Sequence, residues 1–254
     1  MRLLLTNDDG FESPGILLLA DALRGAGHRV IMVAPDRDNS GISHAITFFK
    51  GLHKLAEIGS DSFSFEGTPA DCVVIALRGG LPELSMEDGF APDAVIAGIN
   101  RGANLGSDLV YSGTAGAARQ GAFCGIPSLA LSLVQGDEKD WYWDQAVAFT
   151  VERLEEMLGY WKPDSFVNVN LPNRPEKPEG LVHSYPAFRH YKDVISVYRA
   201  PDGNSYCMAS PERVNADWEA GSDCNAVING SAAISEIFIH PLLIEDVGKR
   251  RFTL

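Results

Sequence analysis

The first 34 residues contain an apolar strand, a polar loop, a helix and a second apolar strand. Leu3–Thr6 and Val30–Ala34 are short apolar runs typical of buried parallel strands. Between them, Ser13-Pro14 supplies an N-cap and a first-turn proline for a helix that runs to Ala26 and ends at Gly27. Two parallel strands joined through a helix form a right-handed crossover. We therefore predict an α/β protein with a Rossmann-like, doubly wound, mostly parallel sheet.

The same alternation of helices and strands continues through the first two thirds of the chain. Apolar periodicity predicts helices over 70–77, 113–121 and 143–158, and strands over 94–97, 128–133 and 166–169. We expect the sheet to be complete at 166–169, apart from one last strand, Ile234–His240, near the C-terminus. The predicted α/β core, which would bind metal and phosphate, spans residues 1–171.

Residues 172–254 have a different pattern. Six prolines between Pro172 and Pro211 separate short stretches rich in tyrosine, phenylalanine and valine. We expect this region to form an extended β-rich C-terminal arm, an oligomerisation region and the final core strand. Since such an arm cannot bury its own apolar face, we predict that it packs on another subunit. The alternative is a long hairpin that lies on its own domain.

The composition narrows the possible partners. The 254 residues carry a net charge of −13, which argues against binding to long nucleic acid or to an anionic membrane. A small phosphorylated substrate is still compatible, because backbone N–H groups and a metal ion can hold a phosphate. The four cysteines have no CxxC pairing, and the apolar run at Leu3–Leu5 is too short for a signal peptide. We expect reduced thiols and a cytoplasmic protein.

Polar segments follow the predicted strands at the edge where parallel sheets bind their ligands. The first holds two neighbouring carboxylates, Asp8 and Asp9, whose mutual repulsion a hard cation such as Mg²⁺ would relieve. Each segment alone could be an ordinary turn or helix cap, but together they predict one site. The four segments are Asn7–Gly10, Pro35–His44, Ala97–Gly106 and Tyr111–Gly116.

Five linked motifs in these segments closely resemble the SurE family of survival proteins. The motifs are Leu4–Gly10, Ala34–Arg37 with Ser40-Gly41, Gly67–Val73, Gly98–Gly102 with Asn104–Gly106, and Tyr111–Thr114. The resemblance implies a metal-dependent 5′/3′-nucleotidase that often forms dimers or tetramers. It also implies one divalent metal ion per subunit, Mg²⁺ or Mn²⁺.

The resemblance also assigns the candidate site residues. The implied metal ligands are Asp8, Asp9, Ser40 and Asn100, of which Asp8 and Asp9 are the candidate catalytic residues. The implied contacts to the substrate phosphate are Asn100, Asn104, Ser112, Gly113 and Thr114.

Some positions depart from the family pattern or have a structural explanation. Asn39 stands where a basic residue is expected, and the strand Ile234–His240 differs from the usual Thr-Pro-Leu-His pattern. We assign no function to His240 or Asp246. Thr68 is predicted to cap a helix that starts at Pro69, so we expect no catalytic role for Asp71 or Cys72.

The expected reaction is hydrolysis of a nucleoside 5′-monophosphate, with the 3′-monophosphate as a second possible substrate. Two alternatives remain open at this stage. One is a phosphatase that forms an aspartyl-phosphate, although that chemistry usually places one residue between its two aspartates. The other is a regulatory protein that binds a nucleotide without hydrolysing it. A dinucleotide-dependent oxidoreductase is disfavoured because the first loop lacks G-x-G-x-x-G.

Overall fold

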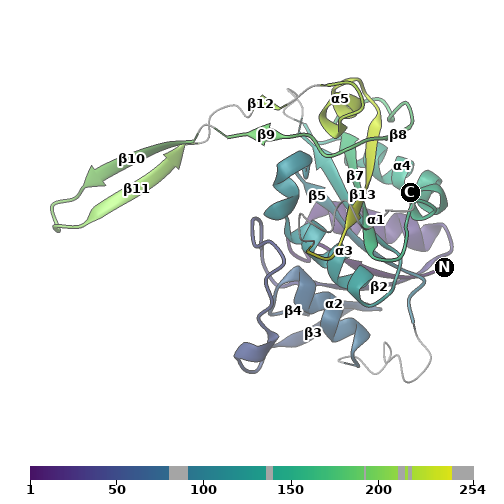
Figure 1. Ribbon diagram of the computed structural model, residues 1–254. Helices are drawn as coiled ribbons and strands as arrows, with labels where there is room; N and C mark the ends of the chain where they lie inside the picture. Colours follow the sequence, from purple (N-terminus) through teal and green to yellow (C-terminus); the bar gives the residue numbers. More distant parts are fainter. Residues whose placement is uncertain (80–90, 136–139, 192, 211–214, 217–218, 242–254) are drawn as a thin grey trace.

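The computed structural model describes residues 1–79, 91–135, 140–191, 193–210, 215–216 and 219–241. Figure 1 shows a body built around one sheet and a long hairpin that extends away from it. The sheet has nine strands in the order β3-β4-β2-β1-β5-β6-β7-β13-β8. Strands β4, β2, β1, β5, β6 and β7 are parallel neighbours, and the alternating pattern predicts all of them except β4. The mostly parallel α/β fold is therefore confirmed.

The elements follow the chain with short connections. The helices are α1 (Pro14–Gly25), α2 (Pro69–Leu77), α3 (Gly113–Phe123), α4 (Trp143–Leu158) and α5 (Asp223–Ile228), with 3₁₀ turns η1 (Phe48–Lys50) and η4 (Gly106–Val110). The strands of the main sheet are β1 (Arg2–Thr6), β2 (Arg29–Pro35), β3 (Leu55–Gly59), β4 (Ser62–Phe65), β5 (Ala94–Arg101), β6 (Ser128–Val134), β7 (Ser165–Pro172), β8 (Leu181–His183) and β13 (Ala232–Phe238). The remaining strands are β9 (Arg189–His190), β10 (Val194–Arg199), β11 (Ser205–Ser210) and β12 (Asn215–Ala216).

Helices cover both faces of the sheet, as in a doubly wound fold. Alternate residues of the strands point to opposite faces, so Leu3 and Leu5 pack against α1 and α4, whereas Leu4 packs against α2 and α3. Most of the central strand residues are buried, in keeping with their continuous apolar sequence. Within the described residues, no helix combines the length and the apolar character needed to cross a membrane.

The sheet extends further at both edges than the sequence predicts. The β3–β4 hairpin adds two strands beyond β2, and β8 adds one beyond β13. The expectation that the sheet is complete at 166–169, with one later strand, is therefore wrong. The missed strands have only three to five residues each, which is too short for a periodic pattern to identify them. The later strand is confirmed as β13, shifted to Ala232–Phe238.

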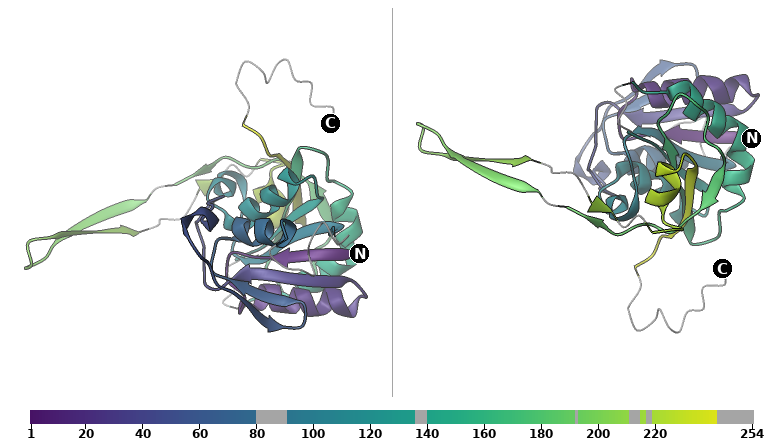
Figure 2. Two further views of the ribbon diagram at one scale, coloured as in Figure 1. Left: turned by 90° about the horizontal axis from the view of Figure 1, so that it is seen from below. Right: turned by 90° about the horizontal axis from the view of Figure 1, so that it is seen from above.

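The projecting hairpin consists of β10 and β11, which pair antiparallel. Figure 2 shows from two further directions that it stands clear of the body. The alternative of a hairpin lying on its own domain is therefore wrong. Both faces of the hairpin expose large apolar side chains: Val194, Ile195, Val197, Tyr198, Tyr206 and Met208. The predicted arm is thus present, and residues 172–191 run along the body before it begins.

Candidate active site

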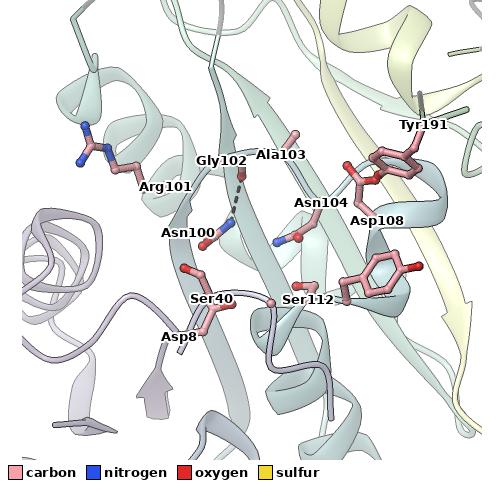
Figure 3. A pocket seen from close by; sticks show the side chains of 12 residues that line it. Asp8, Ser40, Asn100, Arg101, Gly102, Ala103, Asn104, Asp108, Ser112 and Tyr191 are labelled. Carbon is pink, nitrogen blue, oxygen red and sulfur yellow. Dashed lines mark hydrogen bonds between the residues drawn. The ribbon is translucent and has the colours of Figure 1, made fainter. Parts of the chain in front are cut away.

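The loops after β1, β2 and β5 meet at one edge of the sheet, where they surround a cavity of about 290 Å³. Five predicted site residues line it: Asp8, Ser40, Asn100, Asn104 and Ser112. Figure 3 shows Asp8, Ser40 and Asn100 gathered at one side of the cavity, with Asn104 and Ser112 beside them. Segments far apart in the sequence therefore form one polar site, as the strand-end positions predict.

Asp8 lies against the first turn of α3 and is almost completely buried. Thr114 donates its backbone N–H to Asp8 Oδ2 at 3.0 Å and its hydroxyl to Asp8 Oδ1. A helix N-terminus stabilises a negative charge, so α3 supports the ionised form of this carboxylate. The contact also explains Gly113, because a Cβ atom there would lie 2.8 Å from Asp8 Cβ.

The two aspartates are held in an environment that disfavours their charge. Burial raises the pKa of Asp8 to about 6. The hydrogen bond from the Thr114 hydroxyl lowers this pKa, and the negative charge of Asp9 raises it. Burial also raises the pKa of Asp9, whereas the hydrogen bond from the Arg101 N–H lowers it. A cation between the carboxylates would offset both effects.

Asp9 does not line the cavity as the other predicted ligands do. It is partly buried, and its Oδ2 accepts a hydrogen bond of 2.9 Å from the backbone N–H of Arg101. The Arg101 side chain points away from the cavity in Figure 3 and its guanidinium lies 5.1 Å from the ring centre of Trp141. Arg101 therefore orients Asp9 through its backbone.

Ser40 and Asn100 bring neutral oxygen atoms to the same side of the cavity. The loop of Ser40 is tied to the first loop by a 2.7 Å hydrogen bond from Asn39 N–H to Asp8 C=O. Ser40 is exposed and donates its hydroxyl to Asp38. The Asn100 amide donates to Gly102 C=O at 3.0 Å, which leaves its carboxamide oxygen for a ligand.

The remaining predicted phosphate contacts differ in what they offer. Ser112 caps α3 by accepting a hydrogen bond from Ala115 N–H, so its own hydroxyl hydrogen is free to donate. The donors of Thr114 are both directed at Asp8, and neither Thr114 nor Gly113 lines the cavity. In this structure Thr114 therefore positions Asp8. Asn104 is buried and lines the cavity.

The cavity is also lined by Asp108, Tyr111 and Tyr191, to which the sequence assigns no role in the site. Asp108 forms an ion pair with Arg189 at the base of the arm. Tyr191 also comes from the base of the arm, far from the other segments in sequence. Its position depends on the path of the chain after β9, for which the sequence contains no local signal.

Thr68, Cys72 and His240, for which we expected no catalytic role, lie outside the cavity lining. Thr68 caps α2 in a capping box with Asp71, as predicted. Cys72 is fully buried, and all four cysteines are free. His240 is half exposed, 3.2 Å from an Asp164 carboxylate oxygen, beside a different cavity near the start of β7. Asp246 lies outside the described residues.

Comparison with known proteins identifies the family. The family model for the survival protein SurE matches residues 3–193. The chain belongs to the SurE family. It is 37% identical over 241 residues to the 5′-nucleotidase SurE of Xanthomonas euvesicatoria pv. vesicatoria (strain 85-10), which covers 94% of this chain and 90% of that protein. It is 38% identical over 239 residues to the 5′-nucleotidase SurE of Stenotrophomonas maltophilia (strain R551-3), which covers 93% of this chain and 89% of that one.

A solved structure of the SurE family has the same fold. The crystal structure of the SurE protein from Aquifex aeolicus is 33% identical, with a TM-score of 0.81 and coverage of 99% of both chains. The similarity therefore includes the C-terminal region as well as the α/β core.

Proposed function

We propose that this SurE-family chain hydrolyses nucleoside 5′-monophosphates, and also 3′-monophosphates, to nucleoside and inorganic phosphate. The main support is the gathering of Asp8, Ser40 and Asn100 at one cavity. Asp9, next to Asp8 in the chain, is held by the backbone N–H of Arg101, another residue of the cavity lining. Relatives that match nearly the whole chain are named 5′-nucleotidase SurE, which supports the choice of substrate.

The residues of the site fit one divalent cation, Mg²⁺ or Mn²⁺. Asp8, Asp9, Ser40 and Asn100 would hold it, and all four offer the oxygen ligands that these cations prefer. Among the described residues there is no cluster of three His, Cys, Asp or Glu side chains placed to hold a metal. A cation would thus depend on the hydroxyl and amide oxygens as well as the two carboxylates. When bound, it would polarise a phosphoryl oxygen and lower the pKa of water.

The side chains of the chain itself supply the other parts of the reaction. Asp9 accepts the proton of the attacking water at a carboxylate oxygen, since both oxygens of Asp8 already accept hydrogen bonds from Thr114. The Ser112 hydroxyl and the Asn104 amide donate to the phosphoryl oxygens as negative charge develops on them. Open ligand positions are expected, because only two of the four proposed ligands are charged.

The geometry of Asp8 argues against an aspartyl-phosphate formed on this residue. Both of its carboxylate oxygens accept hydrogen bonds from Thr114, and the side chain is buried beneath the helix end. A nucleophile needs a free oxygen in line with phosphorus, whereas Asp8 is held in place to bind a cation.

Phosphate release from AMP and GMP tests the proposal. With Mn²⁺ or Mg²⁺ we expect release, and with EDTA we expect none. Asp8→Asn and Asp9→Asn should abolish turnover, whereas Asp21→Asn, an exposed change on α1, should not. Activity of either site variant within about tenfold of the parent would contradict the assignment. Nucleotide binding without phosphate release would favour the regulatory alternative.

The arm and the cysteines support two further parts of the proposal. An isolated two-stranded ribbon with exposed apolar side chains on both faces needs a partner, so we propose a homo-oligomer, dimer or tetramer, formed through β10–β11. The four free cysteines are consistent with a reducing compartment, so we propose the cytoplasm.

A further inference from the structure

Two core strands next to the cavity carry polar side chains in otherwise apolar runs. Ser132 on β6 and Asn168 and Asn170 on β7 are all buried, with at most 1% of each residue exposed. Ser132 and Asn170 are neighbours in the sheet, and Asn168 lies two residues before Asn170 on the same face. Burying an amide is unfavourable unless it is hydrogen-bonded. These side chains therefore need partners.

The partner of all three is Asn104 in the cavity wall. Asn170 accepts a hydrogen bond from Asn104 N–H at 2.9 Å and donates one to Asn104 C=O at 3.0 Å. Asn168 donates a second hydrogen bond to the same carbonyl at 3.0 Å. The Asn104 amide donates to Ser132 Oγ at 2.8 Å. Both backbone polar groups and the side chain of Asn104 are thus held by the sheet.

This arrangement supplies four of the hydrogen bonds that fix a glycine-rich loop, beside those from Gly102 N–H to Leu133 C=O and from Gly106 N–H to Asp223. Asn104 lies between Gly102 and Gly106, which both have positive φ angles. Glycine-rich segments lose the most conformational freedom on folding, so such a loop needs anchoring. The anchored side chain uses one amide hydrogen for Ser132, which leaves the second for the cavity.

We propose that Asn170, supported by Asn168, is a positioning residue that holds Asn104 for contact with the substrate phosphate. The inference rests on the proposed nucleotidase function. Neither residue lines the cavity, so both act through Asn104. The alternative is that the buried amides only stabilise the fold.

A matched residue on the same chain separates these two explanations. Asn173 is also a buried asparagine with two hydrogen bonds, accepting from Tyr142 N–H and donating to Asp140 C=O, both at 2.8 Å. Its partners are not in the cavity wall. Asn170→Leu and Asn173→Leu remove comparable contacts, and both should lower the melting temperature.

Kinetics with AMP and Mn²⁺, well below the melting temperature, test the proposal. We expect Asn170→Leu to lower kcat/KM by about 100-fold, as for a displaced substrate contact, and Asn173→Leu to stay within about threefold of the parent. If Asn170→Leu does not fold, Asn168→Val, which removes a single hydrogen bond to Asn104, should lower kcat/KM by about tenfold. The proposal would be overturned if the Asn173 variant lost as much kcat/KM as the Asn170 variant, or as the Asn168 variant where that one is used.

A double-mutant cycle tests whether the effect passes through Asn104. In an Asn104→Ala background, Asn170→Leu should change kcat/KM by less than about threefold, because the contact that it positions is gone. A further loss as large as that in the parent background would overturn the proposal.

The dissociation constant of AMP in EDTA gives a readout without turnover. It should rise about tenfold in Asn170→Leu and stay unchanged in Asn173→Leu. A parent that binds AMP but releases no phosphate would refute the nucleotidase function, while the ratio of dissociation constants would still decide the role of Asn170. A parent that neither binds nor hydrolyses AMP or GMP would refute both.

Discussion

The metal-free protein should become more stable when the charge of Asp8 is removed. Burial raises the pKa of Asp8 from 3.8 to about 6, so the ionised carboxylate is disfavoured in the folded state. A shift of about 2 units corresponds to about 3 kcal/mol of unfolding free energy. The protonated Asp8 therefore contributes about 3 kcal/mol to the stability of the folded protein, fully below pH 4, and this contribution is lost as the pH rises through about 6.

The variant Asp8→Asn isolates this effect. Its amide would place a donor where the carboxylate accepts from Thr114, at a cost of about 1 kcal/mol. In EDTA we therefore expect Asp8→Asn to be about 2 kcal/mol more stable than the parent at pH 8 and about 1 kcal/mol less stable at pH 4. Urea unfolding at a series of pH values measures both.

The control and the refuting result are both direct. Asp21→Asn, whose side chain is 83% exposed, should differ from the parent by less than about 0.5 kcal/mol at either pH. If the stability difference between Asp8→Asn and the parent is the same at pH 4 and pH 8, burial does not disfavour this charge. The electrostatic argument for the proposed cation would then be wrong.

Three further changes test other contacts. Gly113→Ala places a Cβ atom 2.8 Å from Asp8 Cβ. It should lower kcat/KM by about tenfold or more and the unfolding free energy by about 1–3 kcal/mol. Unchanged kinetics would contradict the close packing of Gly113 on Asp8. Thr68→Ala removes the α2 cap and a hydrogen bond to Ala45 C=O. It should lower the unfolding free energy measured in urea by about 1–2 kcal/mol. A change below about 0.3 kcal/mol would show that the cap is unimportant. Replacing Val194–Ser210 with a short glycine-serine linker should give a monomer by light scattering where the parent is the proposed oligomer, and a monomeric parent would exclude the role of the arm.

The sequence predicts those parts of the fold that depend on local patterns. The helix over 143–158 is predicted to the residue, because its apolar positions repeat with helical spacing and few residues interrupt it. The hairpin β3–β4 is missed because β4 has only four residues, although Ser-Phe-Ser-Phe alternates, and because the burial of its polar Ser62 does not follow that alternation. Whether β4 forms depends on its pairing with β2, a tertiary contact that the local sequence pattern does not reveal.

The candidate site also has parts that the sequence predicts and parts that it does not. The strand-end positions predict that the segments of Asp8, Ser40 and Asn100 meet, because parallel strands bring their carboxyl ends to one edge. The choice of these residues within the segments comes from the resemblance to the SurE family. Local spacing does not predict that Thr114 directs its donors at Asp8, nor that Asn170 holds Asn104. Those contacts join segments 66 or more residues apart. The path of the chain between them decides whether they form.

The central claim is that a single divalent cation is held by Asp8, Asp9, Ser40 and Asn100. Anomalous diffraction from crystals soaked in Mn²⁺ tests it most directly. We predict one strong peak between these side chains in each subunit. The absence of a peak there, in a sample that still releases phosphate from AMP, would contradict the account.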